Sequence, residues 1–124
     1  MPHQTIFIIE DDTDLRETMK ELLEIEGFTV ATAENGREGM KLIERNGKPC
    51  LILLDMMMPV MNGWEFLETM QRDQQALLAK TRVAIVSAAV EMADLQQQYG
   101  CSVLKKPVNV DRLFALAHAA CDGC

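Results

Sequence analysis

The chain has 124 residues, the length of one domain, and 48% of them are hydrophobic while 25% are charged. This mixture is typical of globular proteins and excludes the disordered and fibrous classes. Twelve Lys and Arg against 19 Asp and Glu give a net charge of −7, which would repel nucleic-acid phosphates and anionic lipids. We therefore expect one domain over residues 1–124 that binds neither nucleic acid nor a membrane.

No apolar run is long enough to span a bilayer, and the first residues lack the basic and apolar segments of a secretory signal. These features predict a soluble cytoplasmic protein, whose four cysteines would stay unpaired in a reducing compartment. Cys121 and Cys124 have the spacing of a redox or zinc half-site, but no second pair stands at metal-binding spacing. We expect this C-terminal pair to have no function.

Short β-rich runs alternate with helical patterns of apolar residues along the chain. Strands are expected at Thr5–Ile9, Thr29–Ala33, Leu51–Leu54, Arg82–Val86 and Ser102–Lys105. Several of these runs are continuously apolar, as strands buried on both faces of a parallel sheet should be.

Caps and stops mark the expected helices between the strands. A capping box at Asp14 and Glu17 would open the first helix, and Gly27 would end it. The other helices are expected behind caps at Asn35 and Asn109, and over residues 64–72 and 93–99, with Gly63 opening the segment 64–72. Five strands alternating with five helices predict an α/β fold, a flavodoxin-like doubly wound parallel sheet in the order 2-1-3-4-5.

Polar side chains follow four of the expected strands. Glu10, Asp11 and Asp12 follow the first strand, Asp55 follows the third, Ser87 follows the fourth, and the fifth ends in Lys105-Lys106-Pro107. Because functional sites of such sheets lie beyond the carboxyl ends of the strands, we expect these groups to meet at one edge.

The chemistry of this group favours phosphoryl transfer. Clustered carboxylates repel one another unless a cation or a proton neutralises them, and carboxylate oxygens suit Mg²⁺. A fixed ammonium group and a hydroxyl would bind phosphoryl oxygens, and a carboxylate can act as the nucleophile.

These motifs resemble the receiver domain of two-component response regulators over essentially the whole chain. The acidic pair, the segment from Asp55 to Gly63, the Ser87-Ala88 pair and the Lys106-Pro107 pair stand in that family's order. The resemblance implies a stand-alone phosphoacceptor switch or phosphorelay carrier, an enzyme only in its own phosphorylation and dephosphorylation. A histidine kinase or histidine phosphotransfer protein would supply the phosphoryl group, a downstream effector protein would read it, and a monomer is favoured.

The resemblance also implies residue roles. Asp55 would accept the phosphoryl group, and Asp11, Asp55 and the Met57 backbone carbonyl would bind Mg²⁺, with Glu10 acting through a metal-bound water. Lys106 and Ser87 would bind the phosphoryl oxygens, and the bond between Lys106 and Pro107 would be cis. These roles are expectations for positions that match the family's motifs.

Two departures from the family pattern stand out. Val103 occupies the position on the fifth strand where the family often has an aromatic residue. Ser87 and Lys106 are only 19 positions apart, which predicts a shortened segment between them. At two positions that tend to influence hydrolysis, the apolar Met57 and Ala89 would be unable to orient a water, which predicts slow self-dephosphorylation.

Two other functions stay open on the sequence alone. A receiver-like interaction module without phosphorylation would share the fold, although the complete set of site residues weighs against it. A phosphohydrolase of the haloacid-dehalogenase type also uses an aspartyl nucleophile with Mg²⁺, but Met57 stands where its second acid is needed.

Overall fold

The structure is a computed structural model that describes residues 5–46, 48–56, 58, 60–88 and 101–121. Its parallel strands form one sheet in the order β2-β1-β3-β4-β5. They are β1 (Thr5–Ile9), β2 (Thr29–Ala33), β3 (Leu51–Asp55), β4 (Arg82–Ser87) and β5 (Ser102–Lys105). The predicted fold class and strand order are therefore confirmed.

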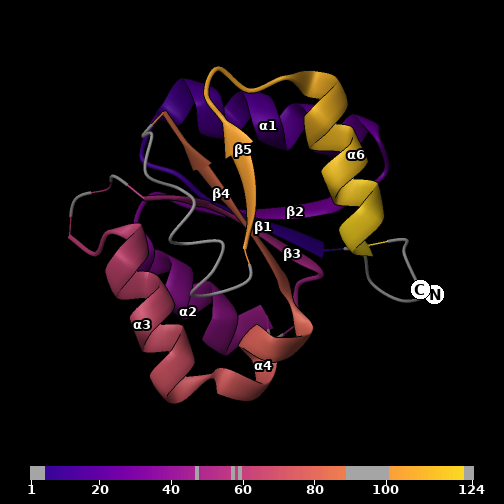
Figure 1. Cartoon of the computed structure of the whole chain (residues 1–124). Helices are drawn as coiled ribbons and strands as arrows, with labels where there is room; N and C mark the ends of the chain where they lie inside the picture. Colours follow the sequence, from indigo (N-terminus) through magenta and orange to yellow (C-terminus); the bar gives the residue numbers. More distant parts are fainter. Residues whose placement is uncertain (1–4, 47, 57, 59, 89–100, 122–124) are drawn as a thin grey trace.

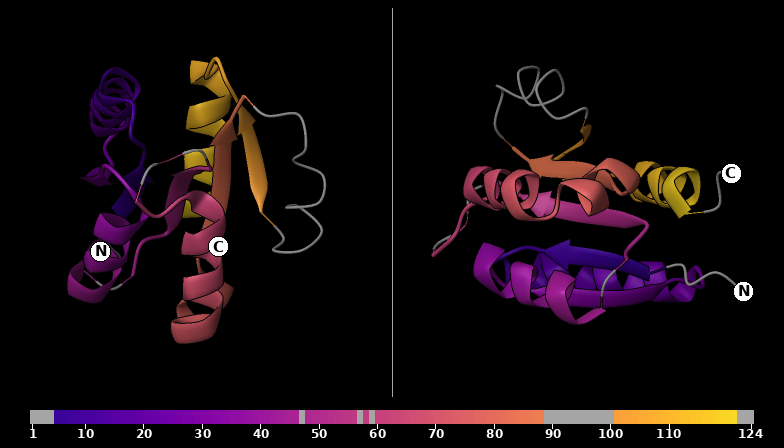
Figure 2. Two further views of the ribbon diagram at one scale, coloured as in Figure 1. Left: turned by 90° about the vertical axis from the view of Figure 1, so that its left-hand side faces the viewer. Right: turned by 90° about the horizontal axis from the view of Figure 1, so that it is seen from below.

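Helices cover both faces of the sheet (Figures 1 and 2). One face is covered by α1 (Thr13–Ile25) and α6 (Val110–Cys121). The other is covered by α2 (Gly36–Asn46), α3 (Gly63–Asp73) and α4 (Gln75–Lys80). Within the described part of the chain, no helix has the length and apolar character needed to cross a membrane.

The continuous apolar character of β1 follows from burial on both of its faces. Ile6 and Ile8 point to the cluster under α1 and α6, whereas Phe7 and Ile9 belong to the cluster under α2 and α3. All four side chains are fully buried. Alternate side chains of one strand thus tie the two hydrophobic layers together.

The start of α1 differs from the prediction. Its N-cap is Asp12, whose side chain accepts a hydrogen bond from the Leu15 backbone N–H at 3.2 Å. The predicted capping box at Asp14 and Glu17 is wrong, because the helix already begins at Thr13 and Asp14 lies inside its first turn. An acidic residue there stabilises the helix through the macrodipole instead.

Other predicted helix ends are confirmed. Asn35 accepts a hydrogen bond from the Glu38 N–H at 2.9 Å, and Asn109 accepts one from the Arg112 N–H at 3.0 Å. Gly27 follows α1 with φ of 102°, a left-handed conformation that glycine adopts without steric cost.

The helix α4 was not predicted from the sequence. It follows α3 after Gln74, and its six residues are too few for a clear 3.6-residue period. The predicted helix at 93–99 and the shortened segment between Ser87 and Lys106 fall largely outside the described residues.

The expectation that all four cysteines stay unpaired is wrong. Cys50, just before β3, and Cys121, the last residue of α6, form a disulfide with their Cα atoms 5.1 Å apart. Their separation of 71 residues hid the pair, because only the folded path of α6 brings them together. Cys101 is a buried free thiol.

Candidate functional site

The carboxyl ends of the central strands bring the predicted site residues to one edge of the sheet. Ile9 on β1 pairs with Leu54 on β3, so Glu10 and Asp55 follow at adjacent positions. Asp55 pairs in turn with Val86, the residue before Ser87 at the end of β4. The parallel register therefore collects side chains that are far apart in the sequence.

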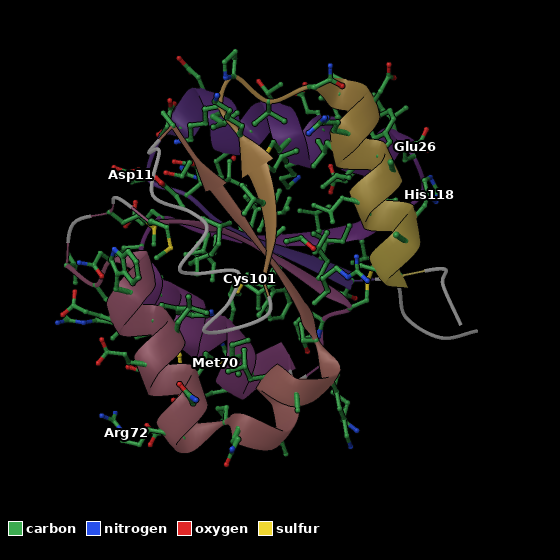
Figure 3. All side chains as sticks on the ribbon, viewed as in Figure 1. Asp11, Glu26, Met70, Arg72, Cys101 and His118 are labelled. Carbon is green, nitrogen blue, oxygen red and sulfur yellow. A yellow bond between two sulfur atoms is a disulfide. The ribbon has the colours of Figure 1, made fainter. Side chains whose placement is uncertain are left out.

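Three carboxylates form a compact acidic cluster. Glu10, Asp11 and Asp55 each place one carboxylate oxygen within 4.8 Å of the others. Glu10 and Asp55 are buried, whereas Asp11 is exposed and lies at the edge of the fold (Figure 3). The predicted carbonyl ligand of Met57 lies outside the described residues.

Burial of Glu10 makes its negative charge costly. Loss of water and the neighbouring Asp55 carboxylate raise the pKa of Glu10 from 4.5 to about 8. Its Oε1 is buried and makes no hydrogen bond within the described residues, although Lys106 Nζ lies 3.3 Å away. Such a site favours either a bound proton or a hard divalent cation, and its oxygen donors fit Mg²⁺.

Lys106 is the cation beside these carboxylates. Its Nζ lies 3.3 Å from Glu10 Oε1 and 3.7 Å from Asp55 Oδ2. Lys105 is exposed. The Lys106 backbone N–H donates to the Ser87 carbonyl at 3.1 Å, and the bond between Lys106 and Pro107 is cis. The ends of β4 and β5 thus hold the ammonium group and the hydroxyl residue near each other.

Ser87 is the last residue of β4 and is buried. The neighbouring β5 carries Val103, which is partly buried and pairs with Ile85. The strand next to Ser87 thus carries an aliphatic side chain, not an aromatic ring, at this position.

Two described residues of the segment after β3, Met56 and Met61, accept backbone hydrogen bonds from neighbouring helices. The Gly63 N–H donates to the Met56 carbonyl at 3.2 Å, and the Gly36 N–H donates to the Met61 carbonyl at 2.9 Å. Val60 has φ of 69°, a conformation that is strained for a β-branched residue. Met56 and Met61 are thus tied to the first residues of α3 and α2, respectively.

Sequence reasoning missed three residues near the site. Arg16 donates from its guanidinium to the Glu10 carbonyl at 2.8 Å, which ties α1 to the acidic strand end. Asn62 and Glu65 form the capping box of α3. The spacing of Asn62 and Glu65 matches a known motif, whereas nothing in the sequence pointed to the contact of Arg16 with residue 10.

Comparison with known proteins agrees with this site. The family model for the response regulator receiver domain matches residues 6–118. The transcriptional regulatory protein CpxR of Escherichia coli strain K12 is 39% identical over 119 residues, which are 92% of this chain and 47% of that protein. A CpxR homolog of Haemophilus influenzae is 34% identical over 115 residues, which are 89% of this chain and 47% of that protein. The chain therefore spans about half the length of these relatives.

Solved structures show the same fold. The signal receiver domain of a putative LuxO repressor protein from Vibrio parahaemolyticus matches with a TM-score of 0.83 and 29% identity, over 98% of this chain and 92% of that one. The chemotaxis protein CheY4 of Vibrio cholerae matches with a TM-score of 0.84 and 23% identity, over 96% of this chain and 99% of that one.

Proposed function

Because the chain belongs to the family of response-regulator receiver domains, we propose that it is a phosphorylation switch whose phosphoacceptor is Asp55. The phosphoryl donor is a phosphohistidine on a histidine kinase or a histidine phosphotransfer protein. The observation that carries the proposal is the position of Asp55, whose carboxylate lies in one cluster with Glu10 and Asp11 and 3.7 Å from Lys106 Nζ.

The transfer step needs a nucleophile and a means of neutralising charge. A carboxylate oxygen of Asp55 attacks the phosphorus atom, the bond from phosphorus to the histidine nitrogen breaks, and the imidazole leaves. Glu10, Asp11 and Asp55 would hold Mg²⁺, which when bound offsets the negative charge of the phosphoryl oxygens. The family's Met57 carbonyl ligand remains a proposal.

Lys106 changes partner as the reaction proceeds. Before transfer its ammonium group is paired with Glu10 and Asp55. After transfer it binds a phosphoryl oxygen, where it continues to compensate negative charge at the same place. The Lys106 N–H is bonded to the Ser87 carbonyl, so the residue that binds the phosphoryl oxygen is joined directly to the end of β4.

The readout is a change in the surface around β4 and β5. The Ser87 hydroxyl donates to a phosphoryl oxygen, and this new bond favours a second arrangement of the chain after β4. An effector protein that prefers this arrangement then binds more tightly. Slow self-dephosphorylation stays a prediction, because Met57 and Ala89 lie outside the described residues.

Intact mass spectrometry tests the phosphoacceptor. The chain is incubated with acetyl phosphate and either Mg²⁺ or a chelator, beside Asp55→Asn and the control Asp12→Asn, which keeps an N-cap side chain for α1. We expect the wild type and Asp12→Asn to gain one phosphoryl group when Mg²⁺ is present, and Asp55→Asn to gain none. An unmodified wild type that binds Mg²⁺ and also fails with a phosphohistidine donor would instead favour an interaction module without phosphorylation.

A further inference from the structure

The disulfide between Cys50 and Cys121 lies at the end of β3 opposite to Asp55. Cys50 directly precedes β3, where its N–H donates to the Thr5 carbonyl at 2.9 Å and its carbonyl accepts from the Arg82 N–H at 3.3 Å. Cys50 is thus fixed in the sheet between β1 and β4. Cys121, its disulfide partner, ends α6. The bond therefore joins the last turn of a surface helix to a rigid position at the start of the central strand.

Both oxidation states of this pair have suitable surroundings. Cys50 Sγ, which is bonded to Cys121 Sγ in the disulfide, also lies 3.2 Å from the Thr5 carbonyl oxygen. In the reduced protein this oxygen accepts a hydrogen bond from the Cys50 thiol, so opening the disulfide leaves the polar S–H of Cys50 with a partner. The site is therefore suited to reversible oxidation.

A cavity beside the pair fits a small charged reactant. Its volume is about 500 Å³, and its lining includes Cys50, Lys80, Arg82 and Ser102. This volume is in the range of small-molecule sites. The two cationic side chains would attract an anionic disulfide compound.

We propose that Cys50 and Cys121 are a reversible thiol–disulfide site that is oxidised by an anionic low-molecular-weight disulfide of the glutathione type. A thiolate of the pair attacks the small disulfide, which forms a mixed disulfide and releases one small thiolate. The second cysteine thiolate attacks the protein sulfur of that mixed disulfide and releases the second small thiolate. Two electrons pass to the small disulfide, and the two cysteine protons end on the released thiols.

The oxidised state holds the end of α6 against the sheet. Leu113 and Ala117 of α6 are buried in the core in any case, whereas Cys121 in its last turn is only partly buried. The disulfide therefore acts on the last turn, beyond the two fully buried residues of α6. Because Asp55 is at the other end of β3, this site works independently of the proposed phosphorylation.

Two other cysteines serve as internal controls. Cys101 is buried, and burial raises the pKa of its thiol to about 11, so it stays protonated and unreactive. Cys124 stands three positions after Cys121 and is the competing partner that a CxxC spacing offers. Variants Cys101→Ser and Cys124→Ser leave the proposed pair intact.

Alkylation and peptide mapping test the pairing in the full chain. Wild type, Cys101→Ser and Cys124→Ser are equilibrated with mixtures of reduced and oxidised glutathione, alkylated with iodoacetamide and digested. We expect each to lose two reactive thiols on oxidation, to regain them on reduction, and to yield a peptide linking Cys50 to Cys121. A link between Cys121 and Cys124, stable glutathione adducts alone, or no loss of thiols would overturn the proposal.

The role of the cavity is tested by changing the charge of the reactant. Lys80→Gln with Arg82→Gln should slow oxidation by oxidised glutathione roughly tenfold, while oxidation by the neutral 2-hydroxyethyl disulfide keeps its rate. Equal slowing with both reagents would refute the anionic specificity. Oxidation should also raise the midpoint of thermal unfolding by roughly 10 °C, since the bond closes a long loop in the unfolded chain. An unchanged midpoint would contradict the locking of α6.

Discussion

The Gly63→Ala substitution tests how closely the backbone of α3 approaches the phosphoacceptor. A Cβ atom at position 63 would lie 2.8 Å from Met56 Cα and 2.9 Å from the Asp55 carbonyl oxygen. Favourable contacts between heavy atoms are about 3.5–4.0 Å, so one of these segments must move by most of an ångström. Both of these atoms belong to the backbone and cannot rotate away, whereas Met56 Sδ, which the Cβ atom would also overlap, ends a flexible side chain that can move.

We expect this overpacking to cost about 3 kcal/mol and to lower the midpoint of thermal unfolding by roughly 10 °C. The displaced segment carries Asp55, so phosphorylation by acetyl phosphate should also slow by roughly tenfold or more at a temperature where the variant is folded. Thermal unfolding followed by circular dichroism and intact mass spectrometry measure the two effects.

Gly27→Ala is the matched control, because it would strain the backbone at a position away from the site. Its φ of 102° disfavours alanine, yet a Cβ atom there would meet no atom within 4 Å. We expect a loss of about 1–2 kcal/mol and an unchanged phosphorylation rate. The reasoning is refuted if Gly63→Ala phosphorylates at the wild-type rate, or if Gly27→Ala slows it equally.

Three further predictions concern the site and its loop. Val60→Asn should stabilise the protein by about 1 kcal/mol in thermal unfolding, since asparagine tolerates a φ of 69° and the exposed valine loses little packing; a lower midpoint would contradict the strain. The raised pKa of Glu10 means that the Mg²⁺-free folded protein binds a proton that the unfolded chain releases, so its stability should fall as the pH rises from 4.5 to about 8. Glu10→Gln should lose this slope in thermal unfolding at a series of pH values, and a slope that persists would assign it to another group. Lys106→Ala should bind Mg²⁺ roughly tenfold more tightly in calorimetry, because a competing cation 3.3 Å from Glu10 is removed, and should be phosphorylated more slowly; unchanged Mg²⁺ affinity would argue that the two cations do not share these carboxylates.

The fold could be predicted because burial on both faces leaves a strong pattern in the sequence. The runs ending at Ile9, Leu54 and Val86 are continuously apolar, and the polar residue or residues after each run mark the edge where a site can form. The parallel topology then places the carboxyl ends of all strands at one edge of the sheet, which determines where these polar residues meet. The meeting of Glu10, Asp55 and Lys106 followed from this rule without knowledge of any distance.

Features that depend on the path of the folded chain could not be predicted in this way. Arg16 lies only six positions after Glu10, but no spacing rule encodes its contact with the Glu10 carbonyl across the turn between β1 and α1. Cys50 and Cys121 meet only through the path of α6. The expected reducing compartment had indicated free thiols, but it carries no information on which residues the completed fold brings together.

The most direct test of the central claim is to locate the phosphoryl group. The protein is phosphorylated with a phosphohistidine donor and Mg²⁺, reduced with borohydride, which converts an aspartyl phosphate to homoserine, and mapped by peptide mass spectrometry. Homoserine at position 55, with Asp11 and Asp12 unmodified, is the predicted result. Modification at Asp11, Asp12 or a histidine, with Asp55 intact, would contradict the assignment of Asp55 as the phosphoacceptor.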